Sequence, residues 1–493
     1  MSYRPIIIAN RCPPYREGEQ AAGGLTAAFR NYIESGDLTW IGLAMGDNGD
    51  GLVDGVDSIE VRPGYKIRFV YRDQRGMEQY YSGLSNGFIW PITHMDEQNL
   101  INLPYYPKPV FNCRDFMEYE WTSRSCFSVA AIDEVKSLKE VGINNISIFI
   151  QDYHHYRLPE HIKTELGNLG IKGVKIAHFI HTPFPRCNIV KEIFKTDRAT
   201  EKDELHHYGL LISGILHADL IGFHIPRYVQ NFLGTVREFF PEAEINDLGD
   251  GKYSIQRGDN MVVVGDYPIG LDVDGVLEAA ANAETDRGAS AIMKMERDAG
   301  KKIIVGAERR DYTKGHLRRF ETIHHVRNDV AYVAFAPPCR EGTKAYQDYN
   351  RAFLKKIRKL DPERKFLHVS DETLSPSRTI ALFRDSDGVL INTHSDGMNL
   401  NIFEAPLAQE SLLPNDRSTV YVGNCGARYL LEQAGFGVED GVVFVNPSDP
   451  EETARRIRQT LGKKRISDRV INWVKRTRSA SLWTDKILGD LMD

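Results

Sequence analysis

The sequence has few cysteines, and none of them is paired at a short spacing. Its six cysteines are scattered over 493 residues, without a C-x-x-C motif or the ligand spacing of a zinc site: Cys12, Cys113, Cys126, Cys187, Cys339 and Cys425. This pattern disfavours a disulfide framework and a structural zinc site. We therefore expect reduced thiols that pack as small apolar residues.

Long hydrophobic runs are absent as well. No apolar segment approaches the roughly 20 residues that a membrane-spanning helix requires. The apolar run in the N-terminal stretch MSYRPIIIANR is too short for a secretory signal. We therefore expect a cytoplasmic protein without a membrane partner.

Neither sign of charge dominates the chain. It has 62 Lys and Arg against 68 Asp and Glu, which gives a formal net charge of -6 at pH 7. Such a balance provides no general attraction to nucleic acid or to an anionic membrane, so any anion must bind in a local pocket. With 42% hydrophobic and 26% charged residues, the composition is that of a globular protein long enough for two or more domains.

Apolar, β-branched runs bounded by turn residues recur along the chain. They do not alternate with polar residues, which predicts strands buried on both faces, as in parallel sheets. The runs are PIIIAN, ISIFI, KIAHFI, ADLIGF, MVVVGDYPIG, KKIIVGA, VAYVAFA, KFLHVS, GVLINT, STVYVGN and GVVFVNP. Helical segments such as LTAAFRNYIES lie between many of them, which predicts an α/β fold.

The runs fall into two groups, separated by the Pro- and Gly-containing segment YPIGLDVDG at residues 267–275. We predict a Rossmann-like domain over residues 1–269, a second over 270–470, and a C-terminal helix over 471–493 that packs back on the first domain. Ligands of open parallel sheets bind beyond the carboxyl ends of the strands. Two such doubly wound domains therefore predict a site in the cleft between them.

Polar residues collect at the predicted strand ends of the first group. They are Arg11, Gly23 and Gly24 after the first run, Asp152, Tyr153, His154 and His155 after ISIFI, and His181 after KIAHFI. The two glycines allow close backbone approach to a ligand before a helix. Each residue alone fits a hydrogen-bonded turn at least as well, and Tyr81 and Trp90 in YYSGLSNGFIW alone fit a hydrophobic core.

The second group has two basic residues across one strand exit, in IVGAERRDYTKG. Arg309 and Lys314 lie five positions apart and can converge on one diphosphate, although a solvated basic loop is an equal alternative. Arg340 follows the next predicted strand in AFAPPCREG.

The stretch NTHSDGMNLNIFEAP follows a further predicted strand. Asp396 is a favourable helix N-cap, and a helix beginning at Gly397 would direct the free backbone N–H groups of Gly397, Met398, Asn399 and Leu400 at an anion. The alternative is an ordinary capped helix whose Leu400, Phe403 and Leu407 face the core.

Taken together and in order, these segments resemble the trehalose-6-phosphate synthases, which are retaining sugar-nucleotide glycosyltransferases of the GT-B fold. The motifs that carry the resemblance are ANR…AGGL, SNGFIWP, DYHHYRLP, HTPFP, RRDYTKG, APPCREGTKAYQ and SDGMNL…FE, and they span nearly the whole chain. The resemblance implies two Rossmann-like domains that face a cleft. It also implies transfer of a glucosyl group from a nucleotide sugar to a phosphorylated acceptor, with glucose 6-phosphate as the first expectation.

The resemblance implies roles for the matching residues. Arg309 and Lys314 would bind the donor diphosphate, together with backbone groups at Gly23, Gly24 and Gly397–Leu400. Glu404 would bind the ribose hydroxyls. Asp396 would bind hydroxyls of the donor sugar, His181 would lie near the reacting carbon, and Asp152 would bind an acceptor hydroxyl. The residues that match the family's binding site for the acceptor phosphate are Arg11, Tyr81, Trp90 and Arg340. The base of the nucleotide is not implied.

The chemistry of such enzymes requires no side-chain nucleophile, since the leaving phosphate itself takes the proton of the acceptor hydroxyl on one face of the sugar. Positioning and stabilisation of the diphosphate charge then provide the catalysis. Neither a cofactor nor a metal is implied. The DVD stretch at Asp272–Asp274 lies at the predicted domain crossing, and the acidic segment 46–57 lacks the ligand alternation of a calcium loop, so we interpret both as turns.

Several departures from the family pattern concern the substrates. Gln151 stands where the family usually has His, SDGMNL where it has RDGMNL, and IFEAP where it has AKEY. The last form resembles the pseudo-glycosyltransferase of validamycin biosynthesis, and FHIPRYVQNF resembles glucosylglycerol-phosphate synthases.

Three hypotheses therefore remain: a trehalose-6-phosphate synthase, a sister transferase with another phosphorylated acceptor, or a non-catalytic sugar-phosphate sensor. The presence of Arg309, Lys314, Asp396 and Glu404 together argues against the sensor. The sequence does not distinguish a monomer from a homo-oligomer.

Overall fold

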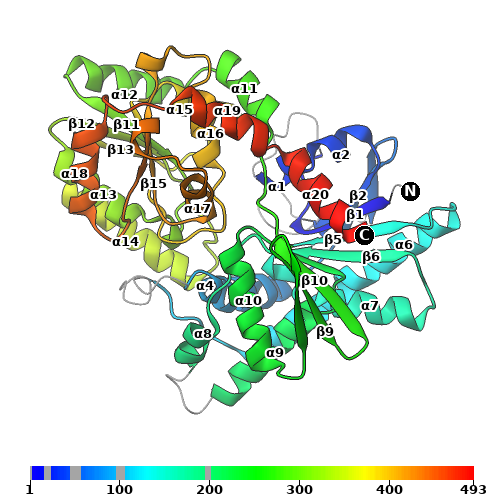
Figure 1. Ribbon diagram of the computed structural model, residues 1–493. Helices are drawn as coiled ribbons and strands as arrows, with labels where there is room; N and C mark the ends of the chain where they lie inside the picture. The colour runs from blue at the N-terminus through cyan, green and yellow to red at the C-terminus, as the bar shows by residue number, and fades with distance from the viewer. Residues whose placement is uncertain (1–2, 16–23, 45–56, 96–105, 195–200, 493) are drawn as a thin grey trace.

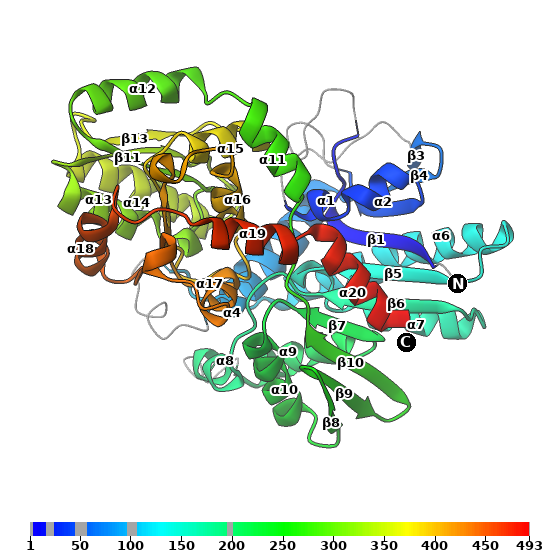
Figure 2. The same ribbon diagram turned by 45° about the horizontal axis from the view of Figure 1, so that its top comes forward.

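The computed structural model describes residues 3–15, 24–44, 57–95, 106–194 and 201–492. Its strands form two sheets, one of ten strands and one of six, each covered by helices (Figure 1). Figure 2 shows the same two lobes from a second direction. Gly23 and nearly all of the acidic segment 46–57 lie outside the described residues.

The first sheet has the strand order β3-β4-β2-β1-β5-β6-β7-β10-β9-β8. The seven strands from β4 to β10 run parallel, whereas β3, β9 and β8 are antiparallel to their neighbours at the two edges. The strands are β1 (Arg4–Arg11), β2 (Leu38–Leu43), β3 (Ser58–Arg62), β4 (Tyr65–Val70), β5 (Ile146–Gln151), β6 (Val174–Phe179), β7 (Leu220–Phe223), β8 (Glu244–Gly249), β9 (Lys252–Arg257) and β10 (Asn260–Asp266).

The second sheet is wholly parallel, in the order β13-β12-β11-β14-β15-β16, which is the doubly wound order of a Rossmann-like sheet. The strands are β11 (Lys302–Ala307), β12 (Val330–Phe335), β13 (Leu367–Ser370), β14 (Gly388–Ile391), β15 (Thr419–Val422) and β16 (Val442–Phe444). All six match runs that the sequence predicts as strands. The predicted α/β fold with two Rossmann-like domains is confirmed.

Helices lie on both faces of each sheet. Those between the strands of the first sheet are α1 (Gly24–Ala28), α2 (Arg30–Ser35), α3 (Gln74–Met77), α4 (Trp90–Thr93), α5 (Cys113–Trp121), α6 (Val129–Glu140), α7 (Leu158–Asn168), α8 (Cys187–Phe194), α9 (Glu201–Ile215) and α10 (Pro226–Phe239). Two π-helical segments, η1 (Glu78–Ile89) and η2 (Thr122–Ser128), and the 3-10 segment η3 (Tyr153–His155) also belong to this part.

The helices after the first sheet are α11 (Val273–Asn282), α12 (Arg287–Asp298), α13 (His316–Val326), α14 (Lys344–Leu360), α15 (Pro376–Arg384), α16 (Asn401–Ala408), α17 (Gly426–Gln433), α18 (Pro450–Thr460), α19 (Asp468–Thr477) and α20 (Ala480–Met492). Short 3-10 segments lie at η4 (Tyr312–Lys314), η5 (Pro414–Asp416) and η6 (Val438–Asp440). In the part of the chain that the structure describes, no helix is both long and apolar enough to cross a bilayer.

The chain passes between the two sheets twice, and the two passages lie side by side. The N–H of Leu271 donates to the Arg478 carbonyl at 2.8 Å, and the N–H of Ala480 donates to the Leu271 carbonyl at 2.9 Å. After this pairing α20 lies against β6, β7 and α1 of the first sheet, as Figures 1 and 2 show. Its Trp483 packs against Phe29 and Phe179. The domain bounds at residues 269 and 470 stay a prediction.

The helix after β14 begins later than predicted, which is a correction. It runs over Asn401–Ala408, so Asp396 is not its N-cap and residues 397–400 form a turn that precedes it. Asn399 has φ of 56°, a left-handed conformation that a helix does not contain. Gly397 packs so closely that an added Cβ would lie 1.8 Å from the His181 carbonyl oxygen. These two constraints outweigh the capping preference of Asp396.

Candidate active site

A cavity of about 980 Å³ lies between the carboxyl ends of the two sheets. Among the residues that the sequence singled out, those that line it include Arg11, Tyr81, Trp90, Asp152, Tyr153, His154, His181, Arg309, Arg340, Asp396, Met398, Asn399 and Leu400. The sequence therefore identified most of the polar residues that meet in this cleft.

Four other predicted residues do not line the cavity directly. Lys314 lies behind Asp396, Gly397 packs under the His181 carbonyl, and Gly24 begins α1. Glu404 lies in the first turn of α16, where burial raises the pKa of its carboxyl to about 7. Gly23 lies outside the described residues. The roles proposed for all these residues stay predictions.

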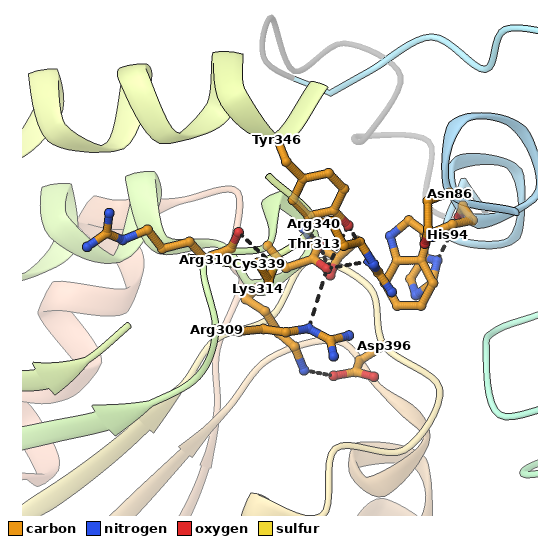
Figure 3. Close-up of polar contacts among 12 residues, drawn as sticks. Asn86, His94, Arg309, Arg310, Thr313, Lys314, Cys339, Arg340, Tyr346 and Asp396 are labelled. Atoms are coloured by element: carbon orange, nitrogen blue, oxygen red, sulfur yellow. Dashed lines mark hydrogen bonds and ion pairs between the residues drawn. The ribbon is translucent and has the colours of Figure 1, made fainter. Parts of the chain in front are cut away.

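Arg340 occupies the centre of the site, after β12. Its guanidinium lies 3.9 Å from the centroid of the Trp90 ring and donates to Asp311 Oδ2 at 3.0 Å and to the Tyr153 hydroxyl at 3.2 Å. It also contacts the Tyr346 hydroxyl, as Figure 3 shows. Burial alone would raise the pKa of Asp311, but Arg340 and Arg309 lower that pKa to about 2. A buried carboxylate thus holds Arg340 in place.

Tyr81 joins residues from the two sheets. Arg11, at the end of β1, donates from Nη2 to the Tyr81 hydroxyl at 3.2 Å, and the positive charge of Arg340 also acts on that phenol. Burial raises the pKa of Tyr81, but the two arginines outweigh burial and lower the pKa. The ring stacks on His154 with 5.8 Å between centroids and 9° between planes. Positive charge from both sheets is therefore concentrated at one phenol.

Arg309 and Lys314 form a second basic group, after β11. Lys314 contacts the Asp396 carboxylate, and Arg309 lies beside them, while Arg310 points away from this group (Figure 3). The Arg309 side chain is 46% exposed and its Nε lies 3.7 Å from Asp311 Oδ2, so most of its charge remains available to the cavity. The predicted convergence of the two cations is compatible with this geometry.

Glu308 organises the floor of this basic group, and the sequence analysis did not identify it. The carboxylate is buried and accepts from Arg319 Nη2 at 2.6 Å and from Asn399 Nδ2 at 2.8 Å. Lys314 Nζ lies 3.5 Å from Glu308 Oε1, the oxygen that also accepts from Asn399. Arg319 is fully buried and also donates to Asn392 Oδ1 at 2.7 Å. This network ties the ends of β11 and β14 together and holds Asn399 in its left-handed conformation.

Asp152 and His181 face the cavity from β5 and β6. Asp152 has φ of 71°, and its Oδ1 accepts from the His181 backbone N–H at 3.2 Å. Burial raises the pKa of the Asp152 carboxyl to about 6, despite backbone hydrogen bonds that lower it. The His181 ring contacts Gln151, whose Oε1 lies 2.9 Å from Nε2. Strained backbone of this kind is typical of functional sites.

A largely apolar wall, which the sequence did not predict, lies on the first-sheet side of the cavity. It includes Cys12, Pro13, Pro14, Tyr15, Leu25, Trp40, Leu43 and Phe69. Leu43 and Phe69 lie at the ends of β2 and β4, two strands that the sequence analysis did not predict, so the wall could not be assembled from the sequence.

In the described part of the chain, no three His, Cys, Asp or Glu residues are grouped so that they could hold a metal ion. The Asp272 side chain accepts from the Gly275 N–H at 3.1 Å and from Arg30 Nη1 at 2.5 Å. It thus caps α11, and Val273 and Asp274 are the first residues of that helix, which corrects the interpretation of this stretch as a turn.

Comparison with known proteins gives the family. The family described as Glycosyltransferase family 20 matches residues 12–493. The chain is 26% identical to the UDP-forming alpha,alpha-trehalose-phosphate synthase 2 of Aspergillus fumigatus, over 99% of this chain and 97% of that protein. It is also 26% identical to the corresponding synthase of Schizosaccharomyces pombe, over 99% and 90% of the two chains.

Solved structures share the fold. A Burkholderia xenovorans trehalose-phosphate synthase in complex with glucose-6-phosphate superposes with a TM-score of 0.77 and 22% identity, covering 99% of this chain and 100% of that one. An E. coli structure bound with UDP-2-fluoro glucose gives a TM-score of 0.76 and 19% identity, covering 99% and 98%. The chain belongs to glycosyltransferase family 20 and is a glycosyltransferase with the GT-B arrangement of two Rossmann-like domains.

Proposed function

We propose that the protein transfers a glucosyl group from UDP-glucose to glucose 6-phosphate with retention of configuration, which gives trehalose 6-phosphate. One observation carries the proposal. Two groups of positive charge meet at a single cavity: Arg11 with Arg340 around Tyr81, and Arg309 in the lining with Lys314 behind Asp396. A transferase of this kind needs two anion sites, one for the donor diphosphate and one for the acceptor phosphate.

The donor site lies on the second sheet. Arg309 and Lys314 bind the diphosphate, and the turn at 397–400 adds backbone N–H groups next to them. Asp396, which contacts Lys314, accepts hydrogen bonds from the sugar hydroxyls. Glu404 is assigned to the ribose hydroxyls. The names of the relatives, which are UDP-forming, support UDP as the nucleotide.

The acceptor site lies between the sheets. Arg11, Tyr81 and Arg340 bind the phosphate, with the buried Trp90 indole beneath Arg340. The Trp90 Nε1 is buried and hydrogen-bonds to no other described residue, so it remains available as a donor. Asp152 then accepts from a hydroxyl of the acceptor sugar.

The reaction requires mainly positioning and charge compensation. The leaving diphosphate takes the proton of the attacking acceptor hydroxyl on the same face of the donor sugar, so retention follows. Arg309 and Lys314 compensate the charge that grows on the diphosphate as the glycosidic bond breaks. The proposal includes neither a metal ion nor a cofactor, and it places the reaction in the cytoplasm.

A second candidate is a sister transferase that uses another phosphorylated acceptor, such as glycerol phosphate or a cyclitol phosphate. The apolar wall formed by Leu43, Phe69 and their neighbours favours an acceptor with fewer hydroxyls than glucose, such as glycerol phosphate, because that wall offers few hydrogen-bond partners.

The test is product analysis with purified protein. UDP-glucose and GDP-glucose are each incubated with glucose 6-phosphate, glycerol 3-phosphate, a cyclitol phosphate and free glucose, and products are identified by mass spectrometry and by the anomeric proton signals. We expect an α,α-linked disaccharide phosphate from UDP-glucose and glucose 6-phosphate. A product only with another acceptor phosphate would replace the first candidate with the second, and no product from any pair would contradict both.

A further inference from the structure

Gln151 is the last residue of β5, and its side chain is enclosed at the edge of the cavity. The residue is 1% exposed. Its Oε1 lies 2.9 Å from His181 Nε2, and its Nε2 donates to the Phe149 carbonyl at 3.4 Å. The amide therefore has one defined orientation, with its nitrogen toward a carbonyl and its oxygen toward the imidazole.

This orientation determines which nitrogen of His181 carries the proton. An amide oxygen only accepts hydrogen bonds, so His181 must donate to it from Nε2–H. A neutral imidazole has one N–H, so Nδ1 then holds a lone pair. His181 Nδ1 makes no hydrogen bond with another residue of the described chain, and the ring is only partly buried at the cavity surface. Nδ1 can therefore accept a hydrogen bond from a ligand.

The surroundings of the ring keep it neutral. The titratable groups around it are His178 on β6, the strand that leads to His181, His224 after the neighbouring strand β7, the Asp152 carboxylate, and Asp396 across the cavity. Phe179 and Trp483, the other rings in contact, do not ionise. Burial first, and then His224 and His178, lower the pKa of His181 well below its usual value.

We propose that Gln151 is a positioning residue that holds His181 as the neutral Nε2–H tautomer, so that Nδ1 accepts a hydrogen bond from a hydroxyl of the donor sugar. This inference rests on the proposed function, because it requires a sugar at the site. Cleavage of a glycosidic bond builds positive charge near the anomeric carbon. A neutral acceptor nitrogen is compatible with that charge, whereas an imidazolium would repel it.

The tautomer of His181 depends on the residue type at position 151. A glutamate at position 151 would also accept the Nε2–H, but its negative charge would favour the imidazolium form of His181. A methionine would fill the same space without an acceptor and would leave the tautomer undetermined. Of glutamine, glutamate and methionine, only glutamine fixes the tautomer of His181 without favouring its imidazolium form.

The first test uses the ligand-free protein. Nitrogen-15 histidine labelling, with the His181 signals assigned by their loss in His181→Asn, reports the tautomer directly. We expect the Nε2–H pattern in the wild type and a mixed or Nδ1–H pattern in Gln151→Met. A wild-type His181 that is Nδ1–H, or one that is charged at pH 7, would overturn the inference whatever the enzyme's substrates are.

The second test is kinetic. Gln151→Met should raise the donor KM or lower kcat by about 10-fold or more, because a misplaced contact near the reacting centre is costly. In Gln151→Glu, kcat/KM for the donor should fall as the pH decreases through an inflection near neutrality that the wild type lacks, since protonated His181 no longer accepts. Gln230→Glu, at an exposed glutamine of α10, adds the same charge and should keep the wild-type profile.

The two variants and the wild type are first compared by circular dichroism and thermal unfolding. If Gln151→Met is folded and its donor kinetics are unchanged, or if Gln151→Glu keeps the wild-type pH profile, the inference is wrong. If the wild type acts on a different nucleotide sugar, the proposed function fails instead, and the same variants are measured with that sugar.

Discussion

Lys314 and Asp396 form an ion pair that joins the segment after β11 to the turn after β14. Both side chains are mostly buried, with exposed fractions of 15% and 19%. Both residues belong to the proposed donor site, so an incoming nucleotide sugar must exchange this contact for its own phosphate and hydroxyl groups. The pair keeps the lysine in position before the donor arrives.

The first prediction concerns the two cations of this site. Arg309→Ala and Lys314→Ala should each lower kcat/KM by more than about 100-fold, because a lost charge partner of the transition state typically costs about 3 kcal/mol or more. Steady-state kinetics with the donor varied provides the measurement.

Lys294→Ala is the matched control, since Lys294 is exposed on α12 and lies away from the cavity. It should retain wild-type kinetics. Near-normal turnover in either Arg309→Ala or Lys314→Ala would show that the donor site has been assigned to the wrong residues.

The second prediction separates the acceptor from the donor. Arg340→Ala should raise the acceptor KM steeply, by roughly 10- to 150-fold, because an arginine–phosphate bond in a desolvated site contributes about 1.5 to 3 kcal/mol. Isothermal titration with UDP should show nearly unchanged donor affinity.

Arg340 also compensates the buried Asp311, so the alanine variant is compared with Arg340→Lys, which keeps the charge. The lysine variant should restore folding stability. A lysine cannot reproduce the bidentate contact of a guanidinium with a phosphate, so the acceptor KM of this variant should stay raised. Weakened UDP binding in both variants would contradict the acceptor assignment.

The third prediction follows from the burial of Asp152. Burial raises the folded-state pKa of its carboxyl to about 6, above the ordinary value of an aspartate, so the ionised carboxylate disfavours folding at neutral pH. This cost to the free energy of unfolding is absent below the pKa that the Asp152 carboxyl has in the unfolded chain, and it appears as the pH rises from about 4 to about 6. It then amounts to roughly 3 kcal/mol. Asp152→Asn should therefore raise Tm at pH 7 and lose this advantage near pH 4.

The same variant should lose acceptor turnover at every pH, because the amide is a weaker acceptor for the sugar hydroxyl. A Tm difference between Asp152→Asn and the wild type that does not depend on pH would show that the Asp152 carboxyl titrates normally in the folded protein.

The fourth prediction concerns the buried network under the donor site. Glu308→Gln removes the charge partner of the fully buried Arg319, and breaking such a pair typically costs 3 to 5 kcal/mol, so about that loss is expected in the free energy of unfolding. Urea denaturation measures it. Glu321→Gln, in a pair with Lys356 that is about one quarter exposed, should cost less than about 1 kcal/mol.

Equal stability losses in Glu308→Gln and Glu321→Gln would show that the Glu308–Arg319 pair does not hold the ends of β11 and β14 together. A selective loss in Glu308→Gln should be accompanied by weaker UDP binding, because Asn399 would no longer be anchored.

The sequence predicted the second sheet better than the first. The inner strands of the second sheet are mostly apolar because helices cover both faces, and β12 is buried at all six positions. In the first sheet, β4 (YKIRFV) alternates apolar and basic residues, and β3 and β8 are edge strands with mostly polar side chains. Such strands depend on their neighbours for stability, and their sequences alone do not identify them.

For the site, the sequence identified residues that follow buried strands, such as Arg309 and Arg340, since parallel strand ends meet at one edge. It could not identify Glu308, and it showed Gln151 only as a departure from the family pattern, because the roles of both depend on contacts with distant side chains. The start of α16 was misplaced for a related reason, because Gly397 meets the carbonyl of His181 from the opposite sheet.

The pairing of Leu271 with Ser479 has a consequence for synthesis on the ribosome. Trp483 completes an aromatic cluster with Phe29, Phe149 and Phe179, so the first sheet lacks part of its core until α20 has been made. The second sheet, whose strands lie between residues 302 and 444, can assemble earlier. The N-terminal half should therefore be the last to reach its final packing, although it is the first to leave the ribosome, and a nascent chain arrested before residue 480 should expose this apolar surface to chaperones.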